Sequence, residues 1–381
     1  MRNLIAAVVV VLLCTAVVAQ APAPSQPQTP PATAQPSAHA QPPAAAQPTT
    51  PTVQQPEAEK VRLQLKFSPA QVLRYRGYAN IAATMDMAIS PAPPQPLPFP
   101  MPMTFGGTAS GVATAKVLRM DPYGGARLRV RLDSGSMTMD MMGQKFQIAL
   151  KGGKVTASGM GKKVTQEKLP KLPGGQAIPL LQKPMEVKIG KRGQLLDIAI
   201  PGFEKEWKQL MAQAKKMYGG VDLMTLIRQT QVLLPENPVA AGESWPFHYE
   251  LTIPGSGAPI VQDMTFTLTK LEVVRGKQIA TISVQGRQTF TNLNLGAMAQ
   301  GAAAPGMPQM PGMSGKMSGE GTTAGTAVFN VTAGTFDRFD LRADFNFRMD
   351  MSVPGGPKGP PQPVSVSVSM AGQVTGALAR L

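Results

Sequence analysis

Cysteine and histidine are almost absent from this chain. The only cysteine among 381 residues, Cys14, lies in an apolar N-terminal segment, and the only histidines are His39 and His248. Beyond that segment the chain can form no disulfide framework, and it offers no cluster of thiolates or imidazoles to a metal ion. Its stability must therefore come from an ordinary hydrophobic core.

Long apolar runs are missing after the first residues. Residues 4–19 form an apolar run that follows Arg2 and ends in the small residue Ala19. This arrangement predicts a secretory signal cleaved after Ala19. The run is shorter than the roughly 20 residues that span a bilayer as a helix, and an uncleaved anchor is the alternative. We expect an exported protein that is periplasmic, secreted or associated with the cell envelope, with no transmembrane segment in the mature chain.

Acidic residues are few relative to basic ones. The chain has 22 Asp and Glu against 37 Lys and Arg, a net charge of +15. This excess favours an anionic envelope surface as a partner, whereas a solvated lysine face is the alternative. Nucleic acid is not expected, because export argues against it and the lysines lack interleaved aromatic residues. The residues expected to contact an anionic surface are Lys151, Lys154, Lys162, Lys163, Lys168 and Lys171.

Apolar and aromatic residues are scarce between the signal and residue 58. Residues 20–57 consist almost entirely of Pro, Ala, Gln, Thr and Ser, which cannot bury enough apolar surface to offset the entropy of ordering. We expect a disordered tether here, followed by a single β-rich domain over residues 58–381. A second low-complexity stretch, rich in Met, Gly and Pro, predicts a flexible loop at about 297–321.

Alternation of apolar and polar residues dominates the domain. The segment VRLQLKF (61–67) and the segment VSVSVSM (364–370) both alternate, which is typical of half-buried strands. Turn signals such as DPYGG (121–125) and KGGK (151–154) separate many such segments. These patterns predict a long antiparallel meander with long strands at about 72–89, 101–119 and 126–141, and further strands continuing to residue 378.

Helical periodicity is confined to the middle of the chain. Phe203, Trp207 and Leu210 share one face of an expected helix that stops at Gly219-Gly220, and a second helix is expected before Pro235. The expected fold class is therefore α+β and strand-dominated: a long curved antiparallel sheet, half-barrel-like, with a central helical hairpin at about 203–233.

Methionine is abundant and patterned. Met-x-Met pairs recur on the expected strands, and the lengths of the hairpins place Met139 near the level of Met103. Flexible, polarizable side chains suit an apolar surface that must adapt to a ligand, although a methionine-filled core beneath helices is equally compatible. The residues expected to line an apolar groove for a lipid or lipid-like ligand are Met85, Met87, Met101, Met103, Met137, Met139, Met141, Phe203, Trp207 and Leu210.

The same sulfur atoms could instead bind copper. Thioethers select Cu(I) among biological metals, and an exported protein can meet copper. A low-complexity surface loop is the simpler interpretation of the segment concerned. The candidate copper ligands are Met307, Met310, Met313 and Met317.

No constellation typical of an enzyme is present in the sequence. The chain contains no phosphate-binding loop, dinucleotide-binding glycine pattern, nucleophile elbow or zinc-ligand spacing. His248 has Ser244 and Glu243 near it in sequence, but strand alternation does not assemble a triad from them. We therefore expect a non-enzymatic binding protein without a cofactor, or alternatively a structural or interaction module of the envelope that holds no ligand.

Two stretches carry a resemblance to a known family. LQLKFSPAQVLRYRGY (63–78) and LLPENPVAAGESWPFHYEL (233–251) resemble the opening strand and the Gly-Glu-Ser-Trp turn of an exported bacterial family of unknown function. Ala70 stands where that family commonly has glycine. The resemblance implies long antiparallel strands around a central helical pair, and it brings no assigned catalytic residues. At the level of topology alone, such a sheet is similar to lipoprotein carriers of the LolA type.

Overall fold

The computed structural model describes ten ranges of the chain. These ranges are 59–91, 101–141, 144–152, 154–159, 162–164, 183–217, 234–252, 256–294, 314–353 and 362–381.

Strands dominate the described residues, as expected from the alternation of the sequence. The strands are β1 (Val72–Ser90), β2 (Met103–Met120), β3 (Ala126–Met141), β4 (Gln144–Lys151), β5 (Lys154–Gly159), β6 (Lys162–Val164), β7 (Met185–Ile189), β8 (Leu195–Ala199), β9 (Ser244–Thr252), β10 (Pro259–Val274), β11 (Lys277–Asn294), β12 (Ser314–Asn330), β13 (Thr335–Val353) and β14 (Val364–Arg380). One helix, α3 (Glu204–Met217), is described among them.

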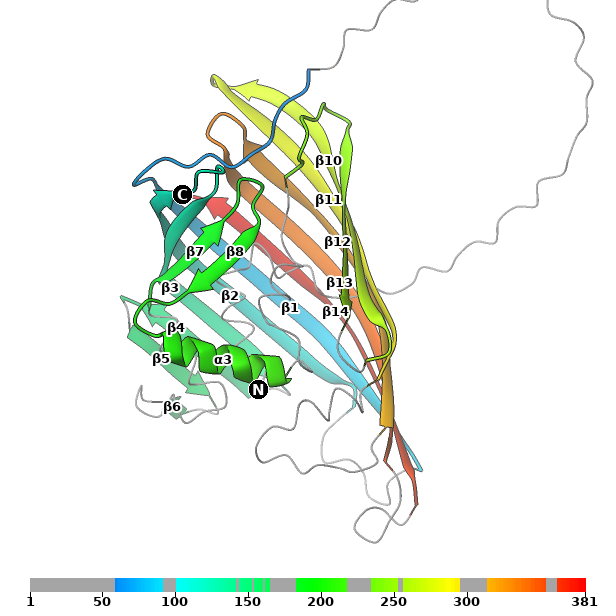
Figure 1. Ribbon diagram of the computed structural model, residues 1–381. Coiled ribbons are helices and arrows are strands. Elements are labelled where there is room, and N and C mark those ends of the chain that lie inside the picture. The colour runs from blue at the N-terminus through cyan, green and yellow to red at the C-terminus, as the bar shows by residue number, and fades with distance from the viewer. Residues whose placement is uncertain are drawn as a thin grey trace, which may run out of the picture.

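All these strands belong to one antiparallel sheet. Its order is β6-β5-β4-β3-β2-β1-β14-β13-β12-β11-β10-β9, and β7 and β8 extend from the first half of β3. Each half of the chain forms a meander, and the two meanders join where the first long strand pairs with the last, β1 with β14. The expected strand-dominated antiparallel sheet is confirmed, and Figure 1 shows β7, β8 and α3 in front of its long strands.

The two faces of the sheet differ in chemistry because side chains alternate along each strand. On β10, for example, Met264, Phe266 and Leu268 are buried, whereas Asp263 and Thr265 are exposed. We call the face with the buried apolar residues the inner face and the opposite one the outer face. Cross-strand partners lie on the same face, so the pairing of the strands assigns each row of the sheet to one of the two faces.

The main core lies on the inner face of β9 to β13. Phe266 and Phe329 are fully buried there, together with aliphatic side chains from β10, β11 and β12. Residues 60–67, which we call the strap, cross this face and add Val61 and Leu63 to the same cluster. The core therefore depends on a segment that precedes the sheet in the chain.

The strap is held by turns rather than by a neighbouring strand. The Leu65 amide donates to the Lys191 carbonyl at 2.7 Å, and the Lys66 amide donates to the Gly334 carbonyl at 3.0 Å. Lys66 Nζ also donates to the Val331 carbonyl at 2.9 Å. Because these partners belong to the β7–β8 and β12–β13 turns, the strap links the two halves of the sheet at one end.

Two local expectations are wrong, and a third is not supported. Residues 61–67 alternate like a strand but form the strap, in which an isolated bridge joins Val61 to Val239. The loop expected at 297–321 ends earlier, because β12 begins at Ser314. The helical hairpin is not supported, because α3 is the one helix in the described ranges and the partner expected for it falls on 218–233, outside them.

The described part of the chain contains no helix with the length and apolar character that crossing a membrane requires.

Candidate functional site

Methionines from neighbouring strands meet on the inner face. Met103 of β2 pairs directly with Met85 of β1, and Met85 pairs with Met370 of β14. Met370 in turn lies opposite Phe347 of β13. Four adjacent strands thus contribute one continuous row of flexible or aromatic apolar side chains, and Met85 and Met103 are the members of this row that the sequence had predicted for the groove.

The rows on either side are also apolar. We call the three rows together the methionine face. Its other members are Met87, Val368, Met349 and Met317 in the row toward the strand ends, and Phe105, Ala83, Gly372 and Phe345 in the row toward the middle of the sheet.

Burial across the methionine face is uneven. Met103 and Val368 are buried, with 7% and 3% of their surface exposed, and Phe345 forms a small core with Ala83 and Ala343. Met85 and Met370, by contrast, are only half-buried. Half-buried methionines in a row leave apolar surface that a further apolar group can cover.

The third methionine strand is displaced from its expected level. The β2–β3 hairpin closes with Met120 opposite Ala126, so that Met139 pairs with Gly107 and lies four residues along the strand from the level of Met103. Met137 pairs with Ala109 and is buried. The hairpin is centred on Tyr123, the middle of DPYGG (121–125), and all five residues of that motif lie outside the ladder, so Met139 falls short of the level of Met103.

The remaining groove residues are less closely associated with the methionine face. Met101 lies just before β2, and the structure describes only the backbone of Met141, which pairs with Phe105. Phe203 precedes α3, and Lys183 Nζ lies 4.7 Å from the centre of its ring. Trp207 is a half-buried residue of α3, which lies in front of β4 and β5 in Figure 1, and the side chain of Leu210 is outside the description.

The expected copper ligands are only partly described. Met317 lies on β12 opposite Met349 and belongs to the methionine face. Met307, Met310 and Met313 lie outside the described residues. Within the described ranges, no group of three or more His, Cys, Asp or Glu residues is placed to hold a metal ion.

The expected lysine contacts are also only partly described. Lys151 and Lys154 are exposed and pair with one another across the β4–β5 hairpin. Lys162 and Lys163 belong to β6, although their side chains are not described, and Lys168 and Lys171 lie outside the described ranges.

The Gly-Glu-Ser-Trp turn anchors the strap. Glu243 accepts a hydrogen bond from the Ala240 amide at 2.9 Å and forms an ion pair with Lys60 at 3.2 Å. These two contacts, the amide first, hold the pKa of the Glu243 carboxyl below its usual value. Trp245 stacks on Phe266 with ring centres 5.8 Å apart. The residues that carry the family resemblance thus tie the strap to the core.

A hollow of about 390 Å³ lies beside the strap. Arg192 forms an ion pair with Glu236 there, and its Nε donates to the Leu234 carbonyl at 2.7 Å. Arg192, one of the cations that line the hollow, is therefore already paired within the fold. The hollow is lined by Arg62, Leu63, Gln64, Lys191, Arg192, Gln194, Pro235 and Glu236.

His248 lies on the outer face and is not part of a triad. Its Nδ1 lies 2.6 Å from an Asp263 carboxylate oxygen, and this hydrogen bond is the main reason that the imidazole pKa is raised. Ser244 bonds Thr267 at 2.8 Å instead. Four residues along a strand correspond to about 13 Å, so Ser244 is out of reach of His248.

Several residues were missed by reasoning from the sequence. Met370, Met349 and Phe347 join the methionine face only because β14 pairs with both β1 and β13, a pairing between opposite ends of the domain. No local pattern reports such a contact. The basic face of β3 was missed as well, although the alternating arginines of ARLRVRL (126–132) are a local signal that could have predicted it.

Comparison with known proteins identifies a family for this chain but no assigned function. Residues 124–335 match the model of DUF6263, described as a family of unknown function. No curated protein matches the chain.

Solved structures resemble the chain only weakly. Pseudomonas aeruginosa OpdQ is 8% identical over 81% of this chain and 98% of its own, with a TM-score of 0.18. Pseudomonas aeruginosa OccK7 (OpdD) is 7% identical over 82% of this chain and 100% of its own, also with a TM-score of 0.18. Similarity at this level carries no argument about fold or function, and the expected likeness to LolA-type carriers is not supported.

Proposed function

This chain belongs to DUF6263, a family of unknown function, and we propose that it is an exported, non-enzymatic protein that binds an apolar ligand against the methionine face. A lipid or other molecule with an acyl chain has the required chemistry. The observation that carries the proposal is the row formed by Met103, Met85 and Met370 on three adjacent strands.

Methionine is a poor choice for a surface whose only task is to form a sheet. Strands favour β-branched and aromatic residues, and a permanently covered face is best packed with stiff aliphatic side chains. Unbranched thioethers instead adapt to guests of irregular shape. Aromatic side chains such as Phe347 would add contact area beside them. This combination favours a surface that receives a flexible apolar chain.

The charge of the protein supports a location beside anionic lipids. The excess of basic residues and the exposed Lys151 and Lys154 at the β4–β5 hairpin would attract the protein to an anionic envelope surface. An acyl chain could then pass between that surface and the methionine face. Export of the chain is part of the same proposal.

A second candidate is a structural or interaction module of the envelope that holds no ligand. The strap favours it, because Val61 and Leu63 join a core that extends over β9 to β13 without help from any guest. In this alternative the methionines serve only to complete the sheet.

Binding of a fluorescent long-chain fatty acid to the full-length protein separates the two candidates. Met85→Gln keeps the length of the side chain but removes its apolar end, which we expect to weaken binding roughly fivefold to tenfold. Thr84→Gln is the matched control, because Thr84 is exposed on the outer face of the same strand. Absence of binding to the unmodified protein, or an equal loss in both variants, would contradict the proposal and favour the structural module.

A further inference from the structure

Three cations lie side by side on the outer face, away from the methionine face. Arg119 of β2 pairs directly with Arg127 of β3, and Arg127 pairs with Lys188 of β7. Like charges placed directly opposite one another destabilise a sheet. Repulsion within this row is therefore a cost to the fold that a ligand of opposite charge would relieve.

The charges in this row are incompletely neutralised. Lys188 Nζ lies 3.0 Å from an Asp121 carboxylate oxygen. Glu186 lies 3.4 Å from Arg127 but only 2.8 Å from Arg129, which therefore holds it more closely. Arg119 donates no hydrogen bond within the described ranges, although its charge contributes, as the last of several causes, to lowering the pKa of Asp121. The donors of its guanidinium group therefore remain open to a ligand.

Arg127 retains a donor that the fold leaves unused. Its Nε is buried and has no hydrogen-bond partner among the described residues. An unpaired buried N–H is costly, and such groups are rare in native proteins unless a ligand or an ion completes them. One terminal nitrogen of the Arg127 guanidinium thus faces Glu186, whereas its Nε–H remains unsatisfied.

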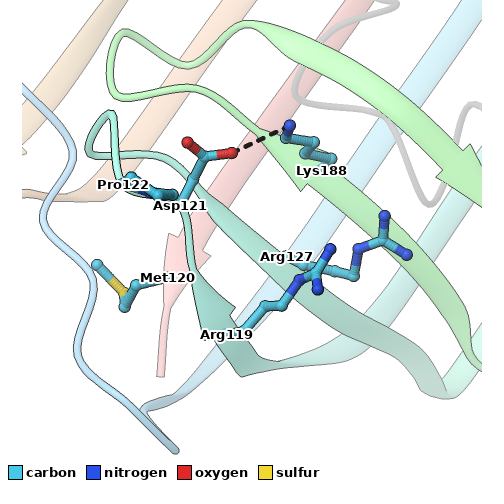
Figure 2. A pocket seen from close by; sticks show the side chains of 6 residues that line it. All are labelled: Arg119, Met120, Asp121, Pro122, Arg127 and Lys188. Atoms are coloured by element: carbon cyan, nitrogen blue, oxygen red, sulfur yellow. Dashed lines mark ion pairs between the residues drawn. The ribbon is translucent and has the colours of Figure 1, made fainter.

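A hollow of about 250 Å³ is present at this position. Figure 2 shows the side chains of Arg119 and Arg127 next to one another, below the ion pair between Asp121 and Lys188. The volume lies below the roughly 300 to 1,000 Å³ typical of pockets for drug-sized ligands, so a small group fits better than a large one. Three cations against one carboxylate leave an excess of positive charge in its wall.

We propose that this hollow binds a phosphate group, either as a free anion or as part of a lipid headgroup. Guanidinium groups match the geometry of phosphate oxygens and can donate to two of them at once. Arg119 and the Nε of Arg127 would supply such donors, and Lys188 would add charge at the rim. The proposal does not depend on apolar binding by the methionine face, which lies at the other end of β2.

Calorimetric titration of the full-length protein with inorganic phosphate, at constant ionic strength in chloride, tests the site. Arg119→Gln removes the cation whose donors the fold leaves open, and we expect it to weaken phosphate binding at least tenfold. Arg131→Gln is the matched control, because Arg131 lies on the same face of β3, pairs with Asp133 at 3.0 Å and is not part of the hollow. We expect this control to change binding less than twofold.

Vesicles distinguish the two sources of phosphate. If the site binds an anionic headgroup, the protein should float with phosphatidylglycerol vesicles but not with phosphatidylcholine vesicles. Arg119→Gln should abolish this flotation, and Arg131→Gln should keep it. Phosphate binding without flotation assigns the site to a free anion. Arg119→Gln should unfold at a temperature no lower than the unmodified protein, because it removes a like-charge pair.

Two results would overturn the proposal. One is a protein that binds neither phosphate above the chloride background nor anionic vesicles. The other is an equal loss in Arg119→Gln and Arg131→Gln, which would assign the attraction to diffuse charge. In both cases the fatty-acid assay with Met85→Gln still decides the apolar site separately.

Discussion

Gly372 of β14 allows a close approach that a single methyl group should disrupt. A Cβ atom at this position would lie 2.5 Å from the Ala82 carbonyl oxygen, 2.6 Å from Cζ of Phe345 and 2.7 Å from Cβ of Ala83. Non-bonded carbon atoms prefer separations of about 3.5 to 4.0 Å. Two of the three contacts involve the backbone or Cβ of β1, which can move only if the strand itself moves.

The expected effect of Gly372→Ala follows from these contacts. Overpacking of a well-packed core costs about 1 to 3 kcal/mol, and replacing glycine by alanine returns about 0.4 to 1 kcal/mol through the unfolded chain. We expect a net loss of about 1 to 2 kcal/mol in the free energy of unfolding. Gly106→Ala is the matched control, since its Cβ would meet no heavy atom closer than the Ile81 carbonyl oxygen at 3.9 Å.

Urea unfolding followed by tryptophan fluorescence measures both variants. The loss in Gly372→Ala should lower the urea midpoint by roughly 0.5 M at an unchanged slope, whereas Gly106→Ala should leave it unchanged or raise it slightly. If Gly372→Ala proved as stable as the unmodified protein, Phe345 would not lie over Gly372, and the registers of β1, β14 and β13 on which the methionine face depends would be wrong.

Three further predictions concern single residues. Ala70 has a φ of 60°, a backbone conformation that is strained by about 1 to 2 kcal/mol for residues other than glycine. Glycine loses more conformational entropy on folding, so Ala70→Gly should raise the free energy of unfolding by no more than about 1 kcal/mol. Urea unfolding measures this change, and a loss of stability would contradict it. Burial, the largest cause, raises the pKa of the Tyr75 phenol from 10.0 to about 12, so the stability of the protein should fall as pH rises between these values. An absorbance titration should contain a late component that Tyr75→Phe removes, and ionisation of all five tyrosines together near pH 10 would refute this prediction. The hydrogen bond to Asp263 raises the pKa of His248 above 6.5. The stability that this bond contributes is therefore complete below pH 6.5 and is lost as pH rises through the raised pKa. Asp263→Asn should lower the pKa of His248 in an NMR titration, and an unchanged pKa would exclude Asp263 as the cause.

Local sequence patterns predicted the elements of the sheet well. Alternation placed β1, β2 and β3 within a few residues of their observed bounds, and the expectation that β1 and β2 bring methionines together holds for Met85 and Met103, whose strands are joined by a hairpin. The strap shows the limit of the same signal. Residues 61–67 alternate because Val61 and Leu63 face the core, yet their backbone groups bond to turns, and periodicity reports burial rather than the hydrogen-bond partner.

The candidate sites depended on contacts that the sequence does not report. Met370 joins Met85 only through the pairing of the first long strand with the last, which closes a loop of almost the whole domain. The cation row likewise needs β7 to return to the edge of β3, where it brings Lys188 beside Arg127. Both contacts are far apart in sequence, so they are set by the topology of the sheet and not by any local motif.

Photo-crosslinking with a diazirine-labelled long-chain fatty acid tests the central claim most directly. Peptide mapping of the labelled full-length protein should find the label on inner-face residues of β1, β2 and β14, with Met85, Met103 and Met370 foremost, and unlabelled fatty acid should suppress it. Label confined to outer-face residues such as Thr84, or no label that competes with unlabelled fatty acid, would contradict an apolar ligand site on the methionine face.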